Sequence, residues 1–310
     1  MVGEAWLWGV LGVVVVVVVG GGDARAAHQH HQLVKEKEVT EQLALIDRLV
    51  DIMLNVTRCD QHKPKDEIKT PKGKAEEEKP AEDVSECDYS ELSESHTMLK
   101  PKNDACEIHK THLTKEEKEE VLFLHNTLRA KVARGEETRG SPGPQPPAAN
   151  MRQVVWNDEL ADVAQAWAAQ CPRGHDASKE RNICSRDYFV GQNIHYYWGY
   201  DEDSDWSRGI NEWYDEVADM PSSYVAAFQL HPTKKIGHYT QVVWAETSEV
   251  GCGLVYYEAE LKGKVYPESK IYVCNYGEAG NIRKWPIYET GPAASLCTKG
   301  VSPAYPDLCI

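Results

Sequence analysis

Hydrophobic positions in the first 26 residues form one continuous run instead of a periodic pattern. The run from Ala5 to Val19 is too short to span a bilayer comfortably, which takes about 20 residues. Ala24-Arg25-Ala26 follows it and has the A-x-A form of a cleavage site. This pattern predicts a secretory signal peptide over residues 1–26. Glu4 stands where a positive charge is usual, so an uncleaved signal anchor is the alternative.

Residues 27–105 are predicted to form an N-terminal extension with two different patterns. Residues 60–86 consist mainly of Lys, Glu and Pro, and such a segment cannot bury enough apolar surface to offset its ordering entropy. We expect a disordered linker there, with order resuming near Cys87 to Cys106. The preceding stretch has helical spacing and predicts one amphipathic helix, which either docks on the main domain or is part of a propeptide; its stripe is Val39, Leu43, Ile46, Leu49, Val50 and Met53.

Three helices are predicted in the part of the chain that follows. Thr114 with Glu117 is a capping box that begins the first helix, and Gly135 ends it. A second helix begins at the N-cap Asn157, and a third covers about residues 207–219. The buried stripe of the first helix is predicted to be Val121, Leu124, Leu128 and Val132.

Strands are predicted where Val, Ile, Tyr and Trp are concentrated. Because this cluster of strands comes late and helices flank it, the simplest architecture is α+β, with helices on both faces of a small, mainly antiparallel sheet. The four predicted strands are 190–198, 239–244, 252–261 and 270–276.

Charge and cysteine content narrow the class of protein. The net charge of −15 argues against nucleic-acid binding and against a polybasic contact with anionic lipid, since both need a basic face. Apart from the N-terminal run, no segment is apolar enough to span a membrane.

Nine cysteines in a secreted chain indicate disulfides, and the odd number leaves at least one thiol over. Asn55 lies in the only N-x-S/T sequon and is a predicted glycosylation site.

Several segments occur together in one order: "VVWNDELADVAQAWAAQC", "GHD", "VGQNIH", "EWYDEV", "GHYTQVVWAET" and "VCNYGEAGN". In these segments the chain resembles the CAP superfamily, and in particular its antigen 5 or venom allergen type. The resemblance implies a three-layer α-β-α sandwich. It places the CAP domain at residues 106–290 and leaves 291–310 as a cysteine-containing tail like that of arthropod members.

The resemblance also implies the disulfide pairing. It leaves Cys59 as the odd thiol, and the four implied pairs are Cys87–Cys184, Cys106–Cys171, Cys252–Cys274 and Cys297–Cys309.

A surface cleft is the candidate site that the resemblance carries over. Its four positions are His175, Gln192, Glu216 and His238, and Gln192 replaces the usual glutamate. Two neutral imidazoles, His175 and His238, suit zinc, while Glu216 is expected to hold a water or to orient a histidine. With one carboxylate missing, we expect weak zinc binding that is lost as the histidines protonate near pH 6–6.5. No cofactor is required.

The sequence favours a secreted, non-enzymatic protein that acts by binding a host protein, a sterol or a lipid. Residues 196–206, rich in aromatic and acidic side chains, are a candidate recognition loop. The alternative is a metal-assisted hydrolase that uses His175, Glu216 and His238. Thr240 and Ser178 are the hydroxyls nearest to the histidines in sequence, but neither G-x-S-x-G nor H-E-x-x-H occurs. A third hypothesis places the activity in the N-terminal extension.

Overall fold

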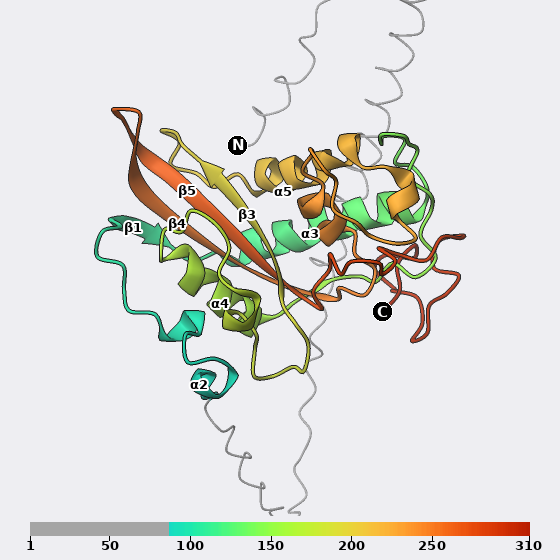
Figure 1. Cartoon of the computed structure of the whole chain (residues 1–310), viewed down its shortest axis with the longest axis horizontal. Helices are drawn as coiled ribbons and strands as arrows, with labels where there is room; N and C mark the ends of the chain where they lie inside the picture. The colour runs from blue at the N-terminus through green and yellow to red at the C-terminus, as the bar shows by residue number, and fades with distance from the viewer. Residues whose placement is uncertain (1–86) are drawn as a thin grey trace, which may run out of the picture. The chain divides into compact units, whose positions relative to one another are not determined.

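The computed structural model describes residues 87–310 (Figure 1). The predictions for the signal peptide, the amphipathic helix, the linker, Asn55 and Cys59 lie outside the described residues. None of the described helices is long and apolar enough to cross a membrane.

One five-stranded sheet forms the middle layer. Four strands run side by side in the order β1-β4-β5-β3, with every neighbouring pair antiparallel, and β2 pairs parallel with the start of β4. β3 therefore lies at an edge of the sheet. The strands are β1 (Ile108–Thr111), β2 (Val155–Trp156), β3 (Gly191–Tyr197), β4 (Glu249–Leu261) and β5 (Lys264–Gly277).

Helices cover both faces of this sheet, which confirms the three-layer α-β-α prediction (Figure 1). On one face, Ala164 and Ala168 of α4 pack on Val255 and Val273 of the sheet. The alternate residues of the same strands face a larger core built with α3, α5 and α6. The helices are α2 (Tyr89–Leu92), α3 (Lys115–Ala133), α4 (Asp158–Ala168), α5 (Trp206–Asp215) and α6 (Gly237–Val242), with short 3-10 turns η1 (Thr97–Leu99), η2 (Ser178–Glu180), η3 (Glu216–Asp219) and η4 (Ser222–Tyr224).

Local sequence signals explain where two of these helices begin. The capping box is present, since the Glu117 amide donates to Thr114 Oγ1 and the Thr114 amide donates to Glu117 Oε2. Asn157 caps α4 by accepting from the Leu160 amide at 3.0 Å. Glycine in β4 lets α4 approach closely, because a Cβ on Gly251 would lie 2.3 Å from the amide nitrogen of Ala161.

The strand predicted over residues 239–244 is wrong, because this segment is helix α6 and the turn after it. The run of β-branched and aromatic residues suits a strand, but contacts from other elements favour the helix. The Glu216 carboxylate accepts from the amide of His238 at its N-terminus. Asn281 Nδ2, in the segment after β5, donates to the carbonyl of Gly237 at 2.9 Å. Tertiary contacts therefore override local propensity here.

The segments on either side of residues 106–290 pack with them. Residues 87–310 fall in one compact unit, so 87–105 and 291–310 are parts of the folded domain. The Cys309 amide donates to the Met151 carbonyl at 2.8 Å, and Leu308 is fully buried. At the other end, Thr97 Oγ1 donates to Asp176 Oδ2 at 2.6 Å.

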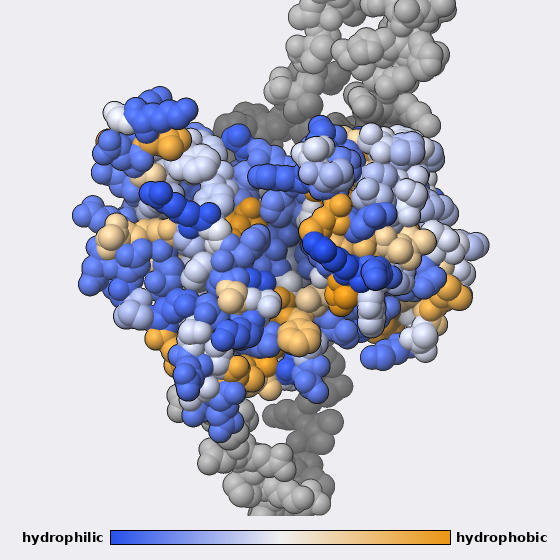
Figure 2. Space-filling model, viewed as in Figure 1, coloured by the Kyte–Doolittle hydropathy of each residue, from blue (hydrophilic) through white to orange (hydrophobic). Residues whose placement is uncertain are grey.

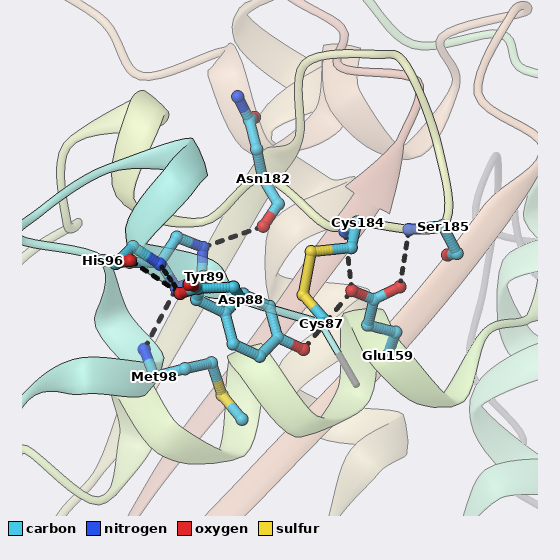
Figure 3. The surroundings of a disulfide bond; sticks show 10 residues. Cys87, Asp88, Tyr89, His96, Met98, Glu159, Asn182, Cys184 and Ser185 are labelled. Carbon is cyan, nitrogen blue, oxygen red and sulfur yellow. Dashed lines mark hydrogen bonds between the residues drawn. A yellow bond between two sulfur atoms is a disulfide. The ribbon is translucent and has the colours of Figure 1, made fainter. Parts of the chain in front are cut away.

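Four disulfides form within residues 87–310, and they are the pairs that the resemblance implies: Cys87–Cys184, Cys106–Cys171, Cys252–Cys274 and Cys297–Cys309. Around the first of them, the Glu159 carboxylate accepts from the amides of Cys184 and Ser185 and from the Tyr89 hydroxyl (Figure 3). The segment before the first long helix is thus tied covalently to the loop before β3, and the Tyr89–Glu159 hydrogen bond ties it to the start of α4.

A buried arginine on α3 organises the core beside α6. Arg129 is 0% exposed, although its charge predicts a solvent-facing position. All five N–H groups of a guanidinium find main-chain carbonyl acceptors at 2.7–3.2 Å, and no carboxylate is among them. Burial lowers the pKa of Arg129. The acceptors belong to Arg152, Val242, Trp244, Ala245 and Thr247.

Replacing Arg129 by lysine is expected to destabilise the domain by at least about 3 kcal/mol, because an ammonium has three donors and leaves buried carbonyls without partners. Urea unfolding of the oxidised protein measures this loss. The matched control is Arg134→Lys, whose ion pairs with Glu136 and Asp307 lie at the surface and should cost less than about 1 kcal/mol. Equal stabilities of the two variants would contradict the role of Arg129.

Candidate functional site

The four cleft residues come from four different segments. His175 lies in the loop after α4, Gln192 on β3, Glu216 at the junction of α5 and η3, and His238 on α6. The structure brings them together as two hydrogen-bonded pairs. His175 Nδ1 lies 2.8 Å from Gln192 Oε1, and His238 Nδ1 lies 2.7 Å from Glu216 Oε1.

The four residues lie on both sides of the edge strand β3. Gln192 and Asn193 are neighbours on the edge strand β3 and therefore face opposite sides of it. Gln192 meets His175 on the side of α4, whereas Asn193 Nδ2 donates to the carbonyl of His238 on the side of α6, at 3.1 Å. The two imidazoles thus approach the edge strand from opposite layers.

Hydrogen bonding fixes the tautomer of His175. The Gln192 amide donates from Nε2 to Asp176 Oδ1 and to Asn275 Oδ1, at 3.1 and 3.0 Å. Its Oε1 is therefore the atom that faces His175, and it accepts from Nδ1–H. In the neutral ring this leaves the lone pair on Nε2.

Glu216 fixes His238 in the same way. One carboxylate oxygen accepts from His238 Nδ1–H, while the other accepts from the main-chain amide of His238 at 2.8 Å. Trp213 stacks against the ring with centroids 6.4 Å apart. The imidazole side chain is 26% exposed, and Nε2 is the ring nitrogen that Glu216 does not engage.

Surrounding groups favour the neutral form of His175. Its pKa is lowered, chiefly because part of the ring is desolvated, and the nearby positive charge of Arg181 adds to this effect. Arg181 is itself held by Asp176, with Nε 2.6 Å from Oδ1. His175 therefore keeps a free lone pair at a lower pH than an ordinary histidine does.

Among residues 87–310, only Cys87, Glu159 and Cys184 place three potential metal donors within 4.8 Å of one another. The two sulfurs of that group are joined in a disulfide and are not free ligands (Figure 3). His175, Glu216 and His238 do not form such a cluster. The cleft accordingly offers two imidazole nitrogens, with Glu216 acting as the partner that orients His238.

The hydroxyls near the histidines in sequence have other contacts. Thr240 Oγ1 contacts the carbonyls of Ile236 and Gly237 and Oδ1 of Asn281. Among the described hydrogen bonds, none joins Thr240 or Ser178 to a histidine. The cleft thus shows no nucleophile paired with a base in the sense that covalent catalysis requires.

A polar chain behind the cleft was missed in the sequence. His125 on α3 is fully buried, its Nδ1 lies 2.8 Å from the Val121 carbonyl, and its Nε2 lies 3.0 Å from the Tyr276 hydroxyl. Asn193 Nδ2 lies 3.4 Å from the same hydroxyl and also contacts the His238 carbonyl. The signal for this chain was the four-residue spacing that places His125 on the same helix face as Val121.

Known proteins share much of this sequence and fold. The family model described as CAP, the cysteine-rich secretory protein family, matches residues 122–276. Venom allergen 3 homolog from Dinoponera quadriceps is 45% identical over 201 residues, which cover 63% of this chain and 83% of that protein. Venom allergen 5 from Vespula vidua is 45% identical over 195 residues, which cover 62% and 89%. The crystal structure of NaASP2 with Zn2+ is 28% identical with a TM-score of 0.50, covering 64% of this chain and 97% of that one.

His125 predicts a pH-dependent stability. Burial lowers its pKa from 6.5 to about 4, so the folded state resists a proton that the unfolded state accepts. The contribution of His125 to stability is therefore fully present above the pKa of this histidine in the unfolded chain. It is lost as the pH falls toward the lower pKa of His125 in the folded state. Between pH 7 and pH 5 we expect a loss of about 2 kcal/mol from this group, measured by urea unfolding.

The variant His125→Gln keeps a donor and an acceptor but does not titrate, so its stability should fall less over this pH range. His231→Gln is the matched control, because His231 serves as a turn acceptor for the amides of Thr233 and Lys234. The same pH dependence in wild type and His125→Gln would show that His125 is not responsible.

Proposed function

The chain belongs to the CAP family of cysteine-rich secretory proteins, and from this premise we propose that it is a secreted protein that acts by binding, without catalysis, through a cleft that takes up zinc weakly. The observation that carries the proposal is the matched arrangement of His175 and His238. Each ring donates its Nδ1–H to a protein oxygen and keeps Nε2 for a ligand. A related structure, that of NaASP2, is described as containing Zn2+, which supports zinc as the ion to test.

The donor set explains why the binding is expected to be weak. Zinc sites normally have four ligands, and here two imidazoles are available while the remaining positions fall to water. Gln192 is neutral, and its amide already contacts His175, Asp176 and Asn275. Glu216 is taken up by His238 and by the start of α6. Zinc, when bound, would keep exchangeable water at its remaining positions, and a donor group of a partner could replace that water.

Secretion is the second part of the proposal. The signal-peptide pattern over residues 1–26, the four disulfides and the venom allergen relatives support an extracellular location. Figure 2 shows a mainly hydrophilic face interrupted by small apolar patches. Large apolar side chains such as Phe189 and Trp285 are more than half exposed, and we propose them as contacts for a protein, sterol or lipid partner.

Zinc titration of the full chain by calorimetry near pH 7 should show uptake at one site. His238→Ala should abolish it, because one imidazole alone holds the ion too weakly, and Glu216→Gln should weaken it by about tenfold through loss of ring orientation. His231→Ala is the matched control and should bind as wild type does. No zinc uptake, or uptake unchanged in His238→Ala, would reject the metal site.

The same titration has a defined pH dependence. Binding requires neutral imidazoles and is lost as they protonate. Since the pKa of His175 is lowered, this ring should still bind zinc below its ordinary value of 6.5, and uptake should extend further into mild acid than two ordinary histidines would allow. Loss of uptake already at or above that value would contradict the effect of burial on His175.

The alternative is a metal-assisted hydrolase, which the His238–Glu216 pair favours because a zinc-bound water next to a carboxylate is a potential nucleophile. We expect purified protein with zinc to cleave casein no faster than the His238→Ala variant does. Activity that survives purification and disappears in that variant would favour the hydrolase.

A further inference from the structure

A second cavity lies away from the histidines, beyond the C-terminal end of α4. Its volume is about 680 Å³, and it lies between the Cys106–Cys171 disulfide and the far ends of β3 and β4. None of the four cleft residues lines it. We call it the aromatic groove, defined by Tyr196, Trp198, Tyr257, Glu258, Glu260 and Arg173.

Three aromatic rings line this groove. Tyr196 lies on β3 and Tyr257 on β4, with β5 between these two strands. Both rings are partly buried against the apolar cluster under α4. Trp198 follows β3 and stacks on Tyr196, with centroids 5.9 Å apart and planes 12° apart. The indole is 43% exposed, so a face or edge of a large ring is open to a ligand.

The groove also carries acidic charge without a protein partner. Glu258 and Glu260 are exposed, and neither takes part in an ion pair among residues 87–310. Arg173 is the single basic side chain that lines the groove. Carboxylates beside exposed aromatic faces are the arrangement that attracts an ammonium group, and the net charge of −15 adds to this attraction.

One buried polar atom in the groove has no partner. The Tyr196 hydroxyl is shielded from solvent and makes no hydrogen bond in the described structure. Burial raises the pKa of Tyr196 to about 12, so the group stays a neutral hydroxyl that accepts or donates. Because this oxygen is closed to solvent, it stays uncharged in the wall of the groove, and the exposed indole and carboxylates are the parts open to a ligand.

We propose that the aromatic groove binds an organic amine, consisting of a primary ammonium group on a flat aromatic ring. The ring stacks on Trp198, and the ammonium lies between the aromatic faces and the carboxylates of Glu258 and Glu260. This site is independent of the zinc proposal, because it shares no residue with the cleft.

Calorimetric titration of the full chain with tryptamine tests this proposal. Indole-3-acetate is the matched probe, since it carries the same ring with the opposite charge. We expect tryptamine to bind at least about tenfold more tightly than indole-3-acetate, a difference of about 1.4 kcal/mol in binding free energy. Equal binding, no binding of tryptamine, or a preference for indole-3-acetate through Arg173 would overturn the proposal.

Variants locate the site. Glu258→Gln combined with Glu260→Gln should weaken tryptamine binding by about tenfold and leave indole-3-acetate no weaker, while Trp198→Ala should weaken both probes. The matched controls are Glu289→Gln and Trp285→Ala, two exposed positions outside the groove, and both should bind as wild type does. Full tryptamine affinity in the double Gln variant would also overturn the proposal.

One further variant separates the two sites. His238→Ala should lose zinc uptake and keep tryptamine binding. Loss of tryptamine binding in His238→Ala would show that the amine occupies the cleft, and the groove assignment would then be wrong, whatever the result with zinc.

Discussion

The fold around the cleft depends on one buried cation. The Arg129 guanidinium holds five main-chain carbonyls, four of which belong to residues 242–247 directly after α6. A buried charge is unfavourable unless all its donors are satisfied, and here main-chain dipoles satisfy them without a carboxylate. These carbonyls lie at and just after the C-terminal end of α6, whereas His238 lies near its start. The contacts of Arg129 therefore help to position His238 from the other end of the helix.

Glu216 provides the second constraint, because it contacts both the main chain of α6 and the imidazole of His238. Its carboxylate accepts from the first amides of α6 and from the imidazole of His238. The helix N-terminus favours the negative charge there, and the same charge orients the ring. The cleft therefore cannot be altered at Glu216 without also disturbing the helix that carries His238. On the other side of β3, Gln192 has the equivalent place beside His175, and as an amide it orients the ring without adding charge.

The sequence correctly predicts those features that depend on residues close to one another in the chain. The capping box at Thr114 and the cap at Asn157 begin helices where expected, because each signal lies within four residues of the atoms it satisfies. Residues 239–244 were assigned to a strand because their side chains suit one, whereas the contacts that make them helical come from residues far away in the chain, such as Glu216. The burial of Arg129 and His125 depends equally on distant partners. The resemblance implies the four candidate residues, whereas their hydrogen-bond partners lie in segments far apart in the sequence.

The edge strand β3 explains how one small domain carries two different surfaces. Gln192 and Tyr196 lie on the same face of β3 and are separated by four residues, about 13 Å along the strand. The first of them lies in a polar network with His175 and Asp176, whereas the second lies in an aromatic setting beyond the end of α4. Ile194 lies between them on the same face and packs with Ala164 and Ala168 of α4, so core side chains separate the two surfaces. Disulfides at Cys106–Cys171 and Cys87–Cys184 fix the two ends of this layer, and a rigid layer of this kind allows each site to change without unfolding the other.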